Sequence, residues 1–355
     1  MDTAFLVSLV CKAPPLPAPV NQVVRASNTE ELVKALEQAP EDTTILLADG
    51  LYTPPPDLYI RRDRISLRGE SGNRDAVILD GGGAFSVMLR IKGACETLIA
   101  DMTFRNCQHY GIFIFGDSDV HGTRIYNVKF EDIWTRAIKG THPQRPGDAP
   151  EPLHSLEHGL RVRPRDGAIQ YCLFVCNSVK PYDDWTGGDY ISGIDMMMLL
   201  NWTFSDNVFS GIRGKNGGGR GAIFIWVYSE DVVVERNLIV DCDRGICFGN
   251  PSGAMPQVTR GIVCQNSILG GADKAIELCG TIDCEVAHNH VYTTNFAFDK
   301  TIHIFGGGHG LRMHHNVVHG HILVEDESAV LEQNIAGDNA ALFLNPERGD
   351  LRLTE

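Results

Sequence analysis

Basic side chains gather in the middle of a chain whose overall charge is acidic. The chain has 355 residues and a formal net charge of −14 at pH 7. The basic candidates lie in or beside two loop-like segments; they are Lys139, Arg161, Arg163, Arg213, Lys215 and Arg220. A guanidinium group binds a carboxylate through two parallel hydrogen bonds. This local cluster therefore favours an acidic polymer as ligand, such as a polysaccharide whose sugars are uronic acids.

β-Elimination is the reaction that such residues could perform on a uronate polymer. It needs a cation to neutralise the substrate carboxylate, a base to remove the neighbouring proton, and an acid to protonate the leaving oxygen. We expect Lys139 or Arg161 to be the base, because nearby cations and partial burial lower the pKa of a basic group. Arg161 and Arg163 flank Val162, so in a strand both would lie on one face. The candidate acids lie in the same insertion and are Tyr182, Tyr190 and His158.

Four carboxylates within 13 residues could hold a hard cation; they are Asp183, Asp184, Asp189 and Asp195. Ca²⁺ takes oxygen ligands and could neutralise a substrate carboxylate. We expect a calcium site at Asp183, Asp184 and Asp189, with Asp195 in the catalytic group. The alternative is a solvated loop in which the aspartates form Asx turns. Lys139 and Asp195 could equally form a structural ion pair.

Aromatic residues beside the same segments could stack on sugar rings; they are Trp185, Phe224 and Trp226. We expect them to bind substrate together with Arg213, Lys215 and Arg220. The alternatives are that the aromatic rings pack on a sheet surface and that the arginines fix the insertion loop. A pair of carboxylates would instead suit a glycoside hydrolase, for example Asp184 with Asp195 or Glu277.

Seven short segments of the type small–Ile–x must position these groups. They begin at Gly111, Ala137, Gly193, Ala222, Gly245, Ala275 and Thr301. A strand-like unit that recurs every 20–30 residues or so is typical of a solenoid. If each segment is a strand of one parallel sheet, the Ile side chains face inward and the next residue faces outward. The outward column then reads Phe113, Lys139, Asp195, Phe224, Cys247, Glu277 and His303.

A second motif is a β-branched run that ends in Asn and is followed by another apolar pair. From Asn207 onward its Asn residues are spaced by 30, 29, 23, 27 and 18 residues. The motif predicts a strand, a tight bend and another strand, because Asn tolerates the left-handed backbone conformation of such a bend. Stacked copies would form a ladder of Asn side chains with a structural role.

The rest of the chain would start, interrupt and close this repeat domain. Residues 1–22 are Pro-rich and are predicted to be a loosely ordered lead-in to a single domain at 23–355. Residues 27–39 have helical apolar spacing, with a capping-box pattern at Ser27 and Glu30, and would cover the open core. Insertions at 140–192 and 213–220 could wall a groove. Residues 341–353 are predicted to form a closing coil.

The first coils resemble a known family. The opening helix, Ile45 to Tyr52, Ile65 to Gly69 and the Asn-bend array resemble right-handed parallel β-helix proteins of the pectate-lyase-like superfamily. The resemblance covers about residues 23–345. It implies an all-β, single-stranded right-handed parallel β-helix of about ten coils, with an N-terminal amphipathic helix cap.

The same resemblance implies a carbohydrate-active protein. Together with the basic cluster it favours a polysaccharide lyase that cleaves a uronic-acid-containing glycan. A glycoside hydrolase, a uronate epimerase and a non-catalytic carbohydrate-binding β-helix protein remain alternatives. The fold suggests a secreted or periplasmic protein, although the first residues do not have the pattern of a signal peptide.

Composition excludes other partners. The chain has no Lys/Arg-rich stripe, which argues against nucleic acid, and no apolar stretch long enough for a membrane span. Its ten Cys lack zinc-finger spacing, and most are expected to be small apolar residues of the stack. Eight of 13 His fall within 288–321, where we expect them to point to different faces rather than form one metal site. The sequence leaves the oligomeric state open.

Overall fold

The chain folds into two compact units in the computed structural model, which describes residues 2–140, 156–252 and 255–354. The N-terminal unit comprises Ala13–Leu173 and Met196–Trp202. The C-terminal unit comprises Met1–Lys12, Phe174–Asp195 and Thr203–Glu355. Three strands contain residues of both units, namely β15 (Leu173–Val175), β16 (Ser192–Met197) and β17 (Leu200–Ser205).

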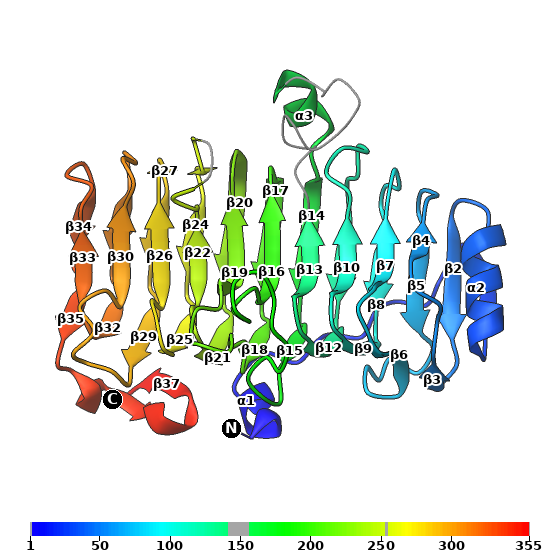
Figure 1. The fold of residues 1–355 in the computed structure, drawn as a ribbon, viewed down its shortest axis with the longest axis horizontal. Coiled ribbons are helices and arrows are strands. Elements are labelled where there is room, and N and C mark those ends of the chain that lie inside the picture. Colours follow the sequence, from blue (N-terminus) through cyan, green and yellow to red (C-terminus); the bar gives the residue numbers. More distant parts are fainter. Residues whose placement is uncertain (1, 141–155, 253–254, 355) are drawn as a thin grey trace. The chain divides into compact units, whose positions relative to one another are not determined.

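Three parallel sheets build the N-terminal unit (Figure 1). Sheet A has the order β1 (Gln22–Ala26), β2 (Thr43–Leu47), β5 (Ser66–Gly69), β8 (Leu98–Ala100), β11 (Arg124–Tyr126) and β14 (Arg165–Gln170). Sheet B has the order β3 (Gly50–Tyr52), β6 (Val77–Ala84), β9 (Thr103–Cys107) and β12 (Lys129–Ile133). Sheet C has the order β4 (Leu58–Ile60), β7 (Val87–Ile91), β10 (Tyr110–Ile114) and β13 (Arg136–Gly140). Its helices are α2 (Thr29–Gln38) and α3 (Leu156–Val162).

The C-terminal unit repeats the three-sheet plan. Its sheet A strands are β20 (Ser229–Glu235), β24 (Ile262–Cys264), β28 (Glu285–Ala287), β31 (Arg312–His314) and β34 (Val330–Glu332), with β23 (Val258–Thr259) and β27 (Thr281–Ile282) beside them. Sheet B has β18 (Val208–Ser210), β21 (Leu238–Cys242), β25 (Ser267–Gly270), β29 (His290–Thr293), β32 (Val317–His319) and β35 (Ile335–Gly337). Sheet C has β19 (Gly221–Trp226), β22 (Ile246–Phe248), β26 (Ile276–Cys279), β30 (Ile302–Phe305) and β33 (Ile322–Val324).

Sheet C has the register that the small–Ile–x segments predict. In the C-terminal unit the stacked partners are Ile223, Ile246, Ile276 and Ile302, all fully buried. The residues after them stack in the same order as Phe224, Cys247, Glu277 and His303. Sheet B has four strands in the N-terminal unit and six in the C-terminal unit among the described residues. The predicted fold, a right-handed parallel β-helix of about ten coils, is confirmed.

The predicted Asn ladder is present in the C-terminal unit. Each Asn donates from Nδ2 to Oδ1 of the Asn on the next coil at 2.8 to 3.0 Å; the series is Asn207, Asn237, Asn266, Asn289, Asn316 and Asn334. The left-handed conformation, however, is adopted by the residue before each ladder Asn, for example His288 (φ 56°) and His315 (φ 54°). The Asn side chains are therefore free to bond along the stack.

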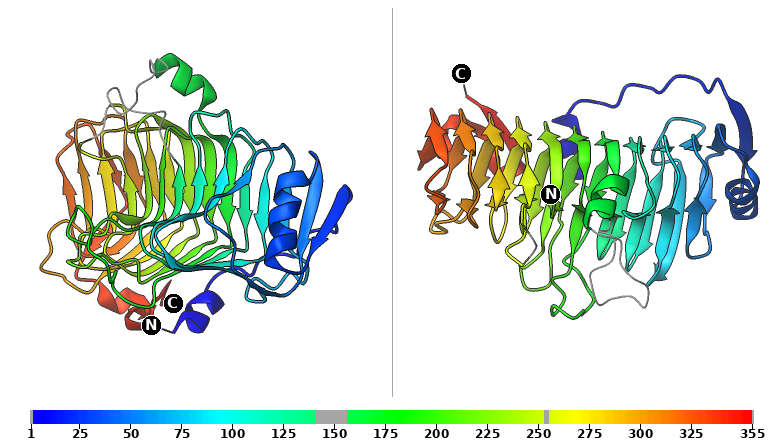
Figure 2. Two further views of the ribbon diagram at one scale, coloured as in Figure 1. Left: turned by 45° about the vertical axis from the view of Figure 1, so that its right-hand side comes forward. Right: turned by 90° about the horizontal axis from the view of Figure 1, so that it is seen from above.

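Helix α2 covers the end of the N-terminal unit, as predicted. Figure 2 shows it in blue against the first strands of that unit, and its buried residues are Leu32, Ala35 and Leu36. The capping box is shifted by one residue from the prediction. Asn28 is the N-cap and accepts from Glu31 N at 3.0 Å, while the Glu31 carboxylate accepts from Ser27 N at 2.8 Å. Asn28 competes successfully because an amide oxygen is as good a cap as a hydroxyl.

The two ends of the C-terminal unit contain short elements that differ from the predictions. Residues Thr3–Ser8 of the expected loose lead-in form helix α1, capped by the Asp2 side chain. The expected closing coil is an antiparallel pair, β36 (Phe343–Asn345) and β37 (Asp350–Leu353), with 3₁₀ turns at Ala340–Leu342 and Pro346–Arg348. Phe343 and Leu351 pack against Val317 of β32. The hairpin thus covers part of sheet B at β29 and β32, whereas Val330, Leu331 and Ile335 of the last strands stay exposed.

All ten Cys are free thiols, and seven are buried, in agreement with their predicted role in the stack. Among the described residues, none of the helices has the length and apolar character needed to cross a bilayer.

Candidate functional site

The predicted base Lys139 lies on the outward side of sheet C in the N-terminal unit. Its register partner in β10 is Phe113, whose other neighbour is Arg90 in β7. Arg90 lies over the Phe113 ring at 5.3 Å and pairs with Asp57 at 2.7 Å. Lys139 is only 5% exposed. The predicted alternation of inward Ile and outward polar residues is therefore correct here, while the catalytic role of Lys139 stays a prediction.

Arg161 and Arg163 do not share a strand face. Residues Leu156–Val162 form helix α3, in which Arg161 is exposed and contacts His158 Nδ1 at 3.0 Å. Arg163 follows the helix and is buried. The alternation prediction was wrong at this point because successive residues of a helix are turned by about 100°, not 180°. The remainder of the predicted His- and Pro-rich insertion, 141–155, lies outside the described residues.

Asp195 belongs to the C-terminal unit, so its predicted pair with Lys139 of the N-terminal unit remains a prediction. Within its own unit Asp195 is 1% exposed and accepts a hydrogen bond from Trp226 Nε1 at 3.0 Å. The Trp226 ring stacks on Phe224 at 5.1 Å. Both rings are buried, which leaves them no face for a sugar. Trp185, the third aromatic residue predicted to bind substrate, is 81% exposed, so its ring has an open face.

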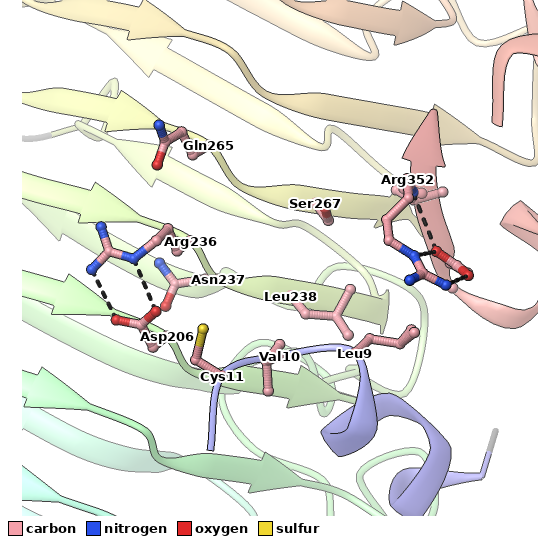
Figure 3. Close-up of a pocket in the computed structure, with 13 residues that line it drawn as sticks. Leu9, Val10, Cys11, Asp206, Arg236, Asn237, Leu238, Gln265, Ser267 and Arg352 are labelled. Atoms are coloured by element: carbon pink, nitrogen blue, oxygen red, sulfur yellow. Dashed lines mark hydrogen bonds and ion pairs between the residues drawn. The ribbon is translucent and has the colours of Figure 1, made fainter. Parts of the chain in front are cut away.

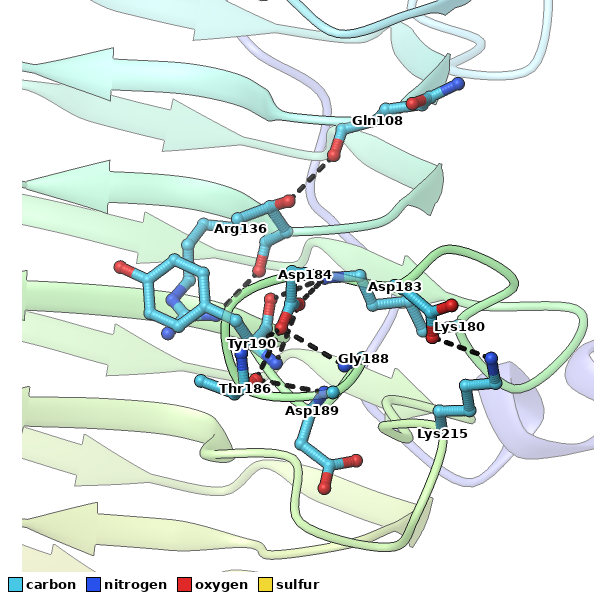
Figure 4. Close-up of polar contacts among 12 residues, drawn as sticks. Gln108, Arg136, Lys180, Asp183, Asp184, Thr186, Gly188, Asp189, Tyr190 and Lys215 are labelled. Atoms are coloured by element: carbon cyan, nitrogen blue, oxygen red, sulfur yellow. Dashed lines mark hydrogen bonds and ion pairs between the residues drawn. The ribbon is translucent and has the colours of Figure 1, made fainter.

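Asp184 organises the predicted calcium loop through its own hydrogen bonds (Figure 4). It pairs with the buried Lys180 and accepts from Thr186 N at 2.7 Å, Gly188 N at 3.1 Å and Tyr190 N at 3.1 Å. Burial alone would raise the pKa of Asp184, but the bonds from Lys180 and Thr186 lower it well below the usual range. These donors already bond to both carboxylate oxygens. The segment therefore has the Asx-type turns that were the alternative to a calcium site.

The other two predicted calcium ligands have separate partners. Asp183 Oδ1 accepts from Lys215 Nζ at 2.7 Å, and Asp189 Oδ1 accepts from Asn216 N at 2.8 Å. Tyr182, the predicted acid that precedes Asp183, is exposed. The carboxylates of Asp184 and Asp189 and one oxygen of Asp183 bond to protein donors, and the Ca²⁺ site stays a prediction. The predicted substrate ligand Arg213 likewise lies 3.3 Å from Asp241.

Three basic residues of the C-terminal unit converge on Glu277, the outward residue of β26. Arg220 Nη1 is 2.9 Å from Oε1, Lys274 Nζ is 3.2 Å from Oε2, and Arg244 Nη1 is 3.5 Å from Oε2. Glu277 is 2% exposed, and Asp273 forms a second carboxylate partner for Arg244 and Lys274. We call Arg220, Arg244 and Lys274 the cation row. Three cations against two carboxylates leave one positive charge in excess.

The cation row follows from the repeat itself. Each member comes directly or almost directly before the small–Ile segment of its coil, at Arg220–Gly221, Arg244–Gly245 and Lys274–Ala275. Because neighbouring strands lie about 4.8 Å apart, Arg244 and Lys274, which are equivalent in register, lie on adjacent coils, and Arg220 comes from the coil before them, one residue earlier in register. Arg220 was predicted as a substrate ligand, but Arg244, Asp273 and Lys274 were missed. The recurrence of a basic residue before small–Ile was the signal that could have identified them.

Electrostatics within this cluster favour the charged forms of Asp273 and Arg244. Burial opposes the charged forms, but the nearby Arg244 and Lys274 lower the pKa of Asp273, and Cys247, Glu277 and Asp273 raise the pKa of Arg244. Burial, reinforced by Glu277, raises the pKa of the Cys247 thiol to about 12. Cys247 is therefore a neutral thiol near neutral pH and not a nucleophile. Arg220 also lies over the Phe224 ring at 4.4 Å.

His303 is the next outward residue after Glu277 in sheet C. Its Nε2 is 2.9 Å from Glu325 Oε1, and its ring stacks on Phe305 at 4.2 Å. Its Nδ1 is buried and makes no hydrogen bond within the described part of the chain. A buried nitrogen without a partner costs free energy, and a catalytic role is one of the explanations for such a group.

A pocket elsewhere in the C-terminal unit has less to offer an acidic ligand (Figure 3). It lies beside the Asn ladder and next to the N-terminal segment that includes Cys11. Its two arginines are already held by carboxylates, Arg236 by Asp206 at 2.9 Å and Arg352 by Asp350 at 2.6 Å. These two arginines are balanced by two carboxylates, whereas the cation row has one positive charge in excess, so the outward face of sheet C is the better candidate site.

Comparison with known proteins supports the fold. No family model and no curated protein sequence matches the chain. Among solved structures it is similar to pectate lyase Pel9A, with a TM-score of 0.55 and 10% identity over 94% of this chain and 88% of that chain. Others are an alginate lyase from Paenibacillus sp. str. FPU-7 (TM-score 0.49, 12% identity, 89% and 99% covered) and PfbA, a surface adhesin of Streptococcus pneumoniae (0.45, 9%, 92% and 90%). The chain is thus a parallel β-helix protein with the pectate-lyase-like fold.

Proposed function

We propose that this protein binds a uronic-acid-containing polysaccharide on the outward face of sheet C and cleaves it by β-elimination. The observation that carries the proposal is the cation row around Glu277. Its members come from three successive coils, so that they form a line along which an extended acidic chain could lie.

The cation row is suited to neutralise a substrate carboxylate. Glu277 and Asp273 hold the three basic groups in place before any ligand arrives, and preorganised charges cost no rearrangement during the reaction. Arg220 Nε is buried and makes no hydrogen bond among the described residues. Neutralising the uronate carboxylate would make the neighbouring C–H acidic, as β-elimination requires.

His303 is the base that we propose for this site. A neutral imidazole that donates from Nε2 to Glu325 keeps a lone pair on Nδ1. That nitrogen lies on the coil next to Glu277 and is unpaired among the described residues. Lys139, with Arg161, Arg163, Tyr182 and Asp195, remains the catalytic group predicted from the sequence, to be tested separately.

The hydrolase alternative is less well supported. It needs a carboxylic acid with a raised pKa as proton donor. The pKa of Asp184 is lowered instead, and its oxygens accept several hydrogen bonds. A non-catalytic binding protein is favoured by a different observation, the exposed Trp185, which could stack on a sugar without any chemistry. A secreted or periplasmic location would suit either function.

The test is incubation with polygalacturonate, alginate and other uronate polymers, followed by ultraviolet absorbance of the unsaturated product. We expect product with the wild type, loss of at least 100-fold in rate with His303→Gln, and no loss with His309→Gln, an exposed histidine of the same unit. Full activity of His303→Gln with loss in Lys139→Ala would move the base to Lys139. Binding of a polymer without any product would overturn the lyase proposal and leave the binding protein. Parallel assays with EDTA and with added Ca²⁺ test the predicted calcium requirement.

A further inference from the structure

Three histidines of the C-terminal unit come together away from the cation row. They are His288, His314 and His315, and one ring nitrogen of each lies within 4.8 Å of the others. The sequence prediction that the clustered histidines point to different faces holds for His303, which lies in sheet C, but not for these three. His288 and His315 occupy equivalent positions just after β28 and β31 on two neighbouring coils, and His314 is the last residue of β31, opposite Ala287.

The ring geometry is close to that of a metal site. His314 Nδ1 lies 2.9 Å from His315 Nδ1, and the His288 ring stacks on the His315 ring at 5.0 Å. Two imidazole nitrogens on a tetrahedral zinc ion, each about 2.0–2.1 Å from the metal, are about 3.3 Å apart. The His314–His315 pair therefore needs only a small movement. His288 and His315 are exposed, so their side chains are free to make it.

A carboxylate supports the cluster from behind. His314 Nε2 lies 3.1 Å from Glu285 Oε1, on the same side of the strand pair. A histidine that binds metal through one ring nitrogen commonly donates its other N–H to a carboxylate, which fixes the ring and raises its basicity. With Nε2–H donated to Glu285, His314 Nδ1 presents its lone pair to the cluster. This contact is a second observation that points to a metal, independent of the histidine count.

The backbone that carries the histidines is rigid. His288 and His315 both have left-handed backbone conformations, and His288 N donates to His314 O at 3.2 Å. Each turn is followed by a ladder residue, and Asn289 Nδ2 donates to Asn316 Oδ1 at 2.8 Å. A preorganised scaffold reduces the conformational entropy that the protein loses when a ligand binds.

We propose that His288, His314 and His315 bind one divalent transition-metal ion, with Zn²⁺ as the best match, and that Glu285 orients His314. Imidazole ligands suit zinc, copper and nickel, whereas calcium prefers oxygen. Three protein ligands leave one tetrahedral position for water. The ion would join two successive coils and stabilise them against separation. This site is independent of the proposed lyase activity.

The test is isothermal titration calorimetry of the full chain, purified without a histidine tag and stripped with EDTA, with ZnCl₂. We expect one equivalent to bind, and at least ten-fold weaker binding for His288→Asn and for His315→Asn. Asn suits these variants because it tolerates the left-handed backbone. His309→Asn, an exposed histidine elsewhere in the unit, should bind as the wild type does. Glu285→Gln should weaken binding about 10-fold or more if it orients His314.

Two further readouts separate metal loss from misfolding. Zinc should raise the thermal midpoint of the wild type and of His309→Asn but not of His288→Asn, since only a ligand that binds the folded state stabilises it. Co²⁺ in place of Zn²⁺ should give the visible absorption of a tetrahedral site in the wild type but not in His288→Asn or His315→Asn. Failure of the wild type to bind zinc, or unchanged binding in folded His288→Asn and His315→Asn, would overturn the proposal.

Discussion

Arg220 and Glu277 lie 2.9 Å apart on the outward face of sheet C, although they are 57 positions apart in the sequence. Glu277 is also contacted by Arg244 and Lys274, and it is almost completely buried. A carboxylate in this position holds together three cations that would otherwise repel one another. The pair therefore preorganises the surface that we assign to the acidic polymer.

Removal of the Glu277 charge should be costly. Breaking a buried ion pair from one side leaves uncompensated charge, and we expect Glu277→Gln to lower the free energy of unfolding by about 3 kcal/mol. Urea unfolding measures this value, with the exposed Glu327→Gln as the matched control. A change no larger than that of the control would mean that the cluster does not depend on Glu277.

The Asn ladder should be strongest in its interior. Asn266 accepts two bonds from Asn237 and donates to Asn289 Oδ1 and Val234 O, all at 2.9 to 3.0 Å. Asn266→Ala leaves these buried partners unsatisfied, so we expect a loss of about 3 kcal/mol of unfolding free energy. Asn334→Ala at the end of the ladder, where fewer bonds are made, should cost about 1 kcal/mol. Equal costs at the two positions, measured by urea unfolding, would refute a cooperative ladder.

The fold was predictable because its signals are local and repeat in every coil. The stacked Ile residues and the ladder Asn residues each occupy one defined position per coil. The cap of α2 was misplaced by one residue because Asn28 and Ser27 are both good N-caps. The prediction of a strand at Arg161 was wrong because a short apolar pattern can fit a seven-residue helix as well as a strand.

The site was less predictable because its contacts join different coils. Which acid meets which cation depends on the register of the strands and on the paths of the turns, and neither is fixed by residue type. Thus Arg213 and Lys215 were expected at the substrate, but each meets an aspartate, Asp241 and Asp183. Arg244 and Lys274 carried only the weak signal of a basic residue before small–Ile.

Stability should fall in acid through Asp184. Its pKa is lowered in the folded state, so its contribution is fully present above the ordinary Asp pKa of about 3.9 and is lost as pH falls through the folded-state pKa. We expect Asp184→Asn to be less stable than the wild type by about 2 kcal/mol at neutral pH. The difference should shrink as the pH is lowered below about 4. Urea unfolding at a series of pH values measures it.

The control for this pH effect is Asp183→Asn. Asp183 forms an exposed ion pair with Lys215, and such pairs contribute about 0–1 kcal/mol. A difference between wild type and Asp184→Asn that does not change with pH would show that the carboxylate charge has no part in folding the loop.

The most direct test of the central claim is the affinity of the wild type and of Arg244→Met for polygalacturonate and alginate, measured by calorimetry at low and at moderate salt. Arg312→Met, an exposed arginine of sheet A in the same unit, is the matched control. If the cation row holds the substrate carboxylates, Arg244→Met should bind at least ten-fold more weakly than the wild type. Its affinity should also fall less when salt is added, because one charge contact is missing. Arg312→Met should bind as the wild type does. Equal affinity of the wild type and Arg244→Met, or no binding of either polymer by the wild type, would contradict the account.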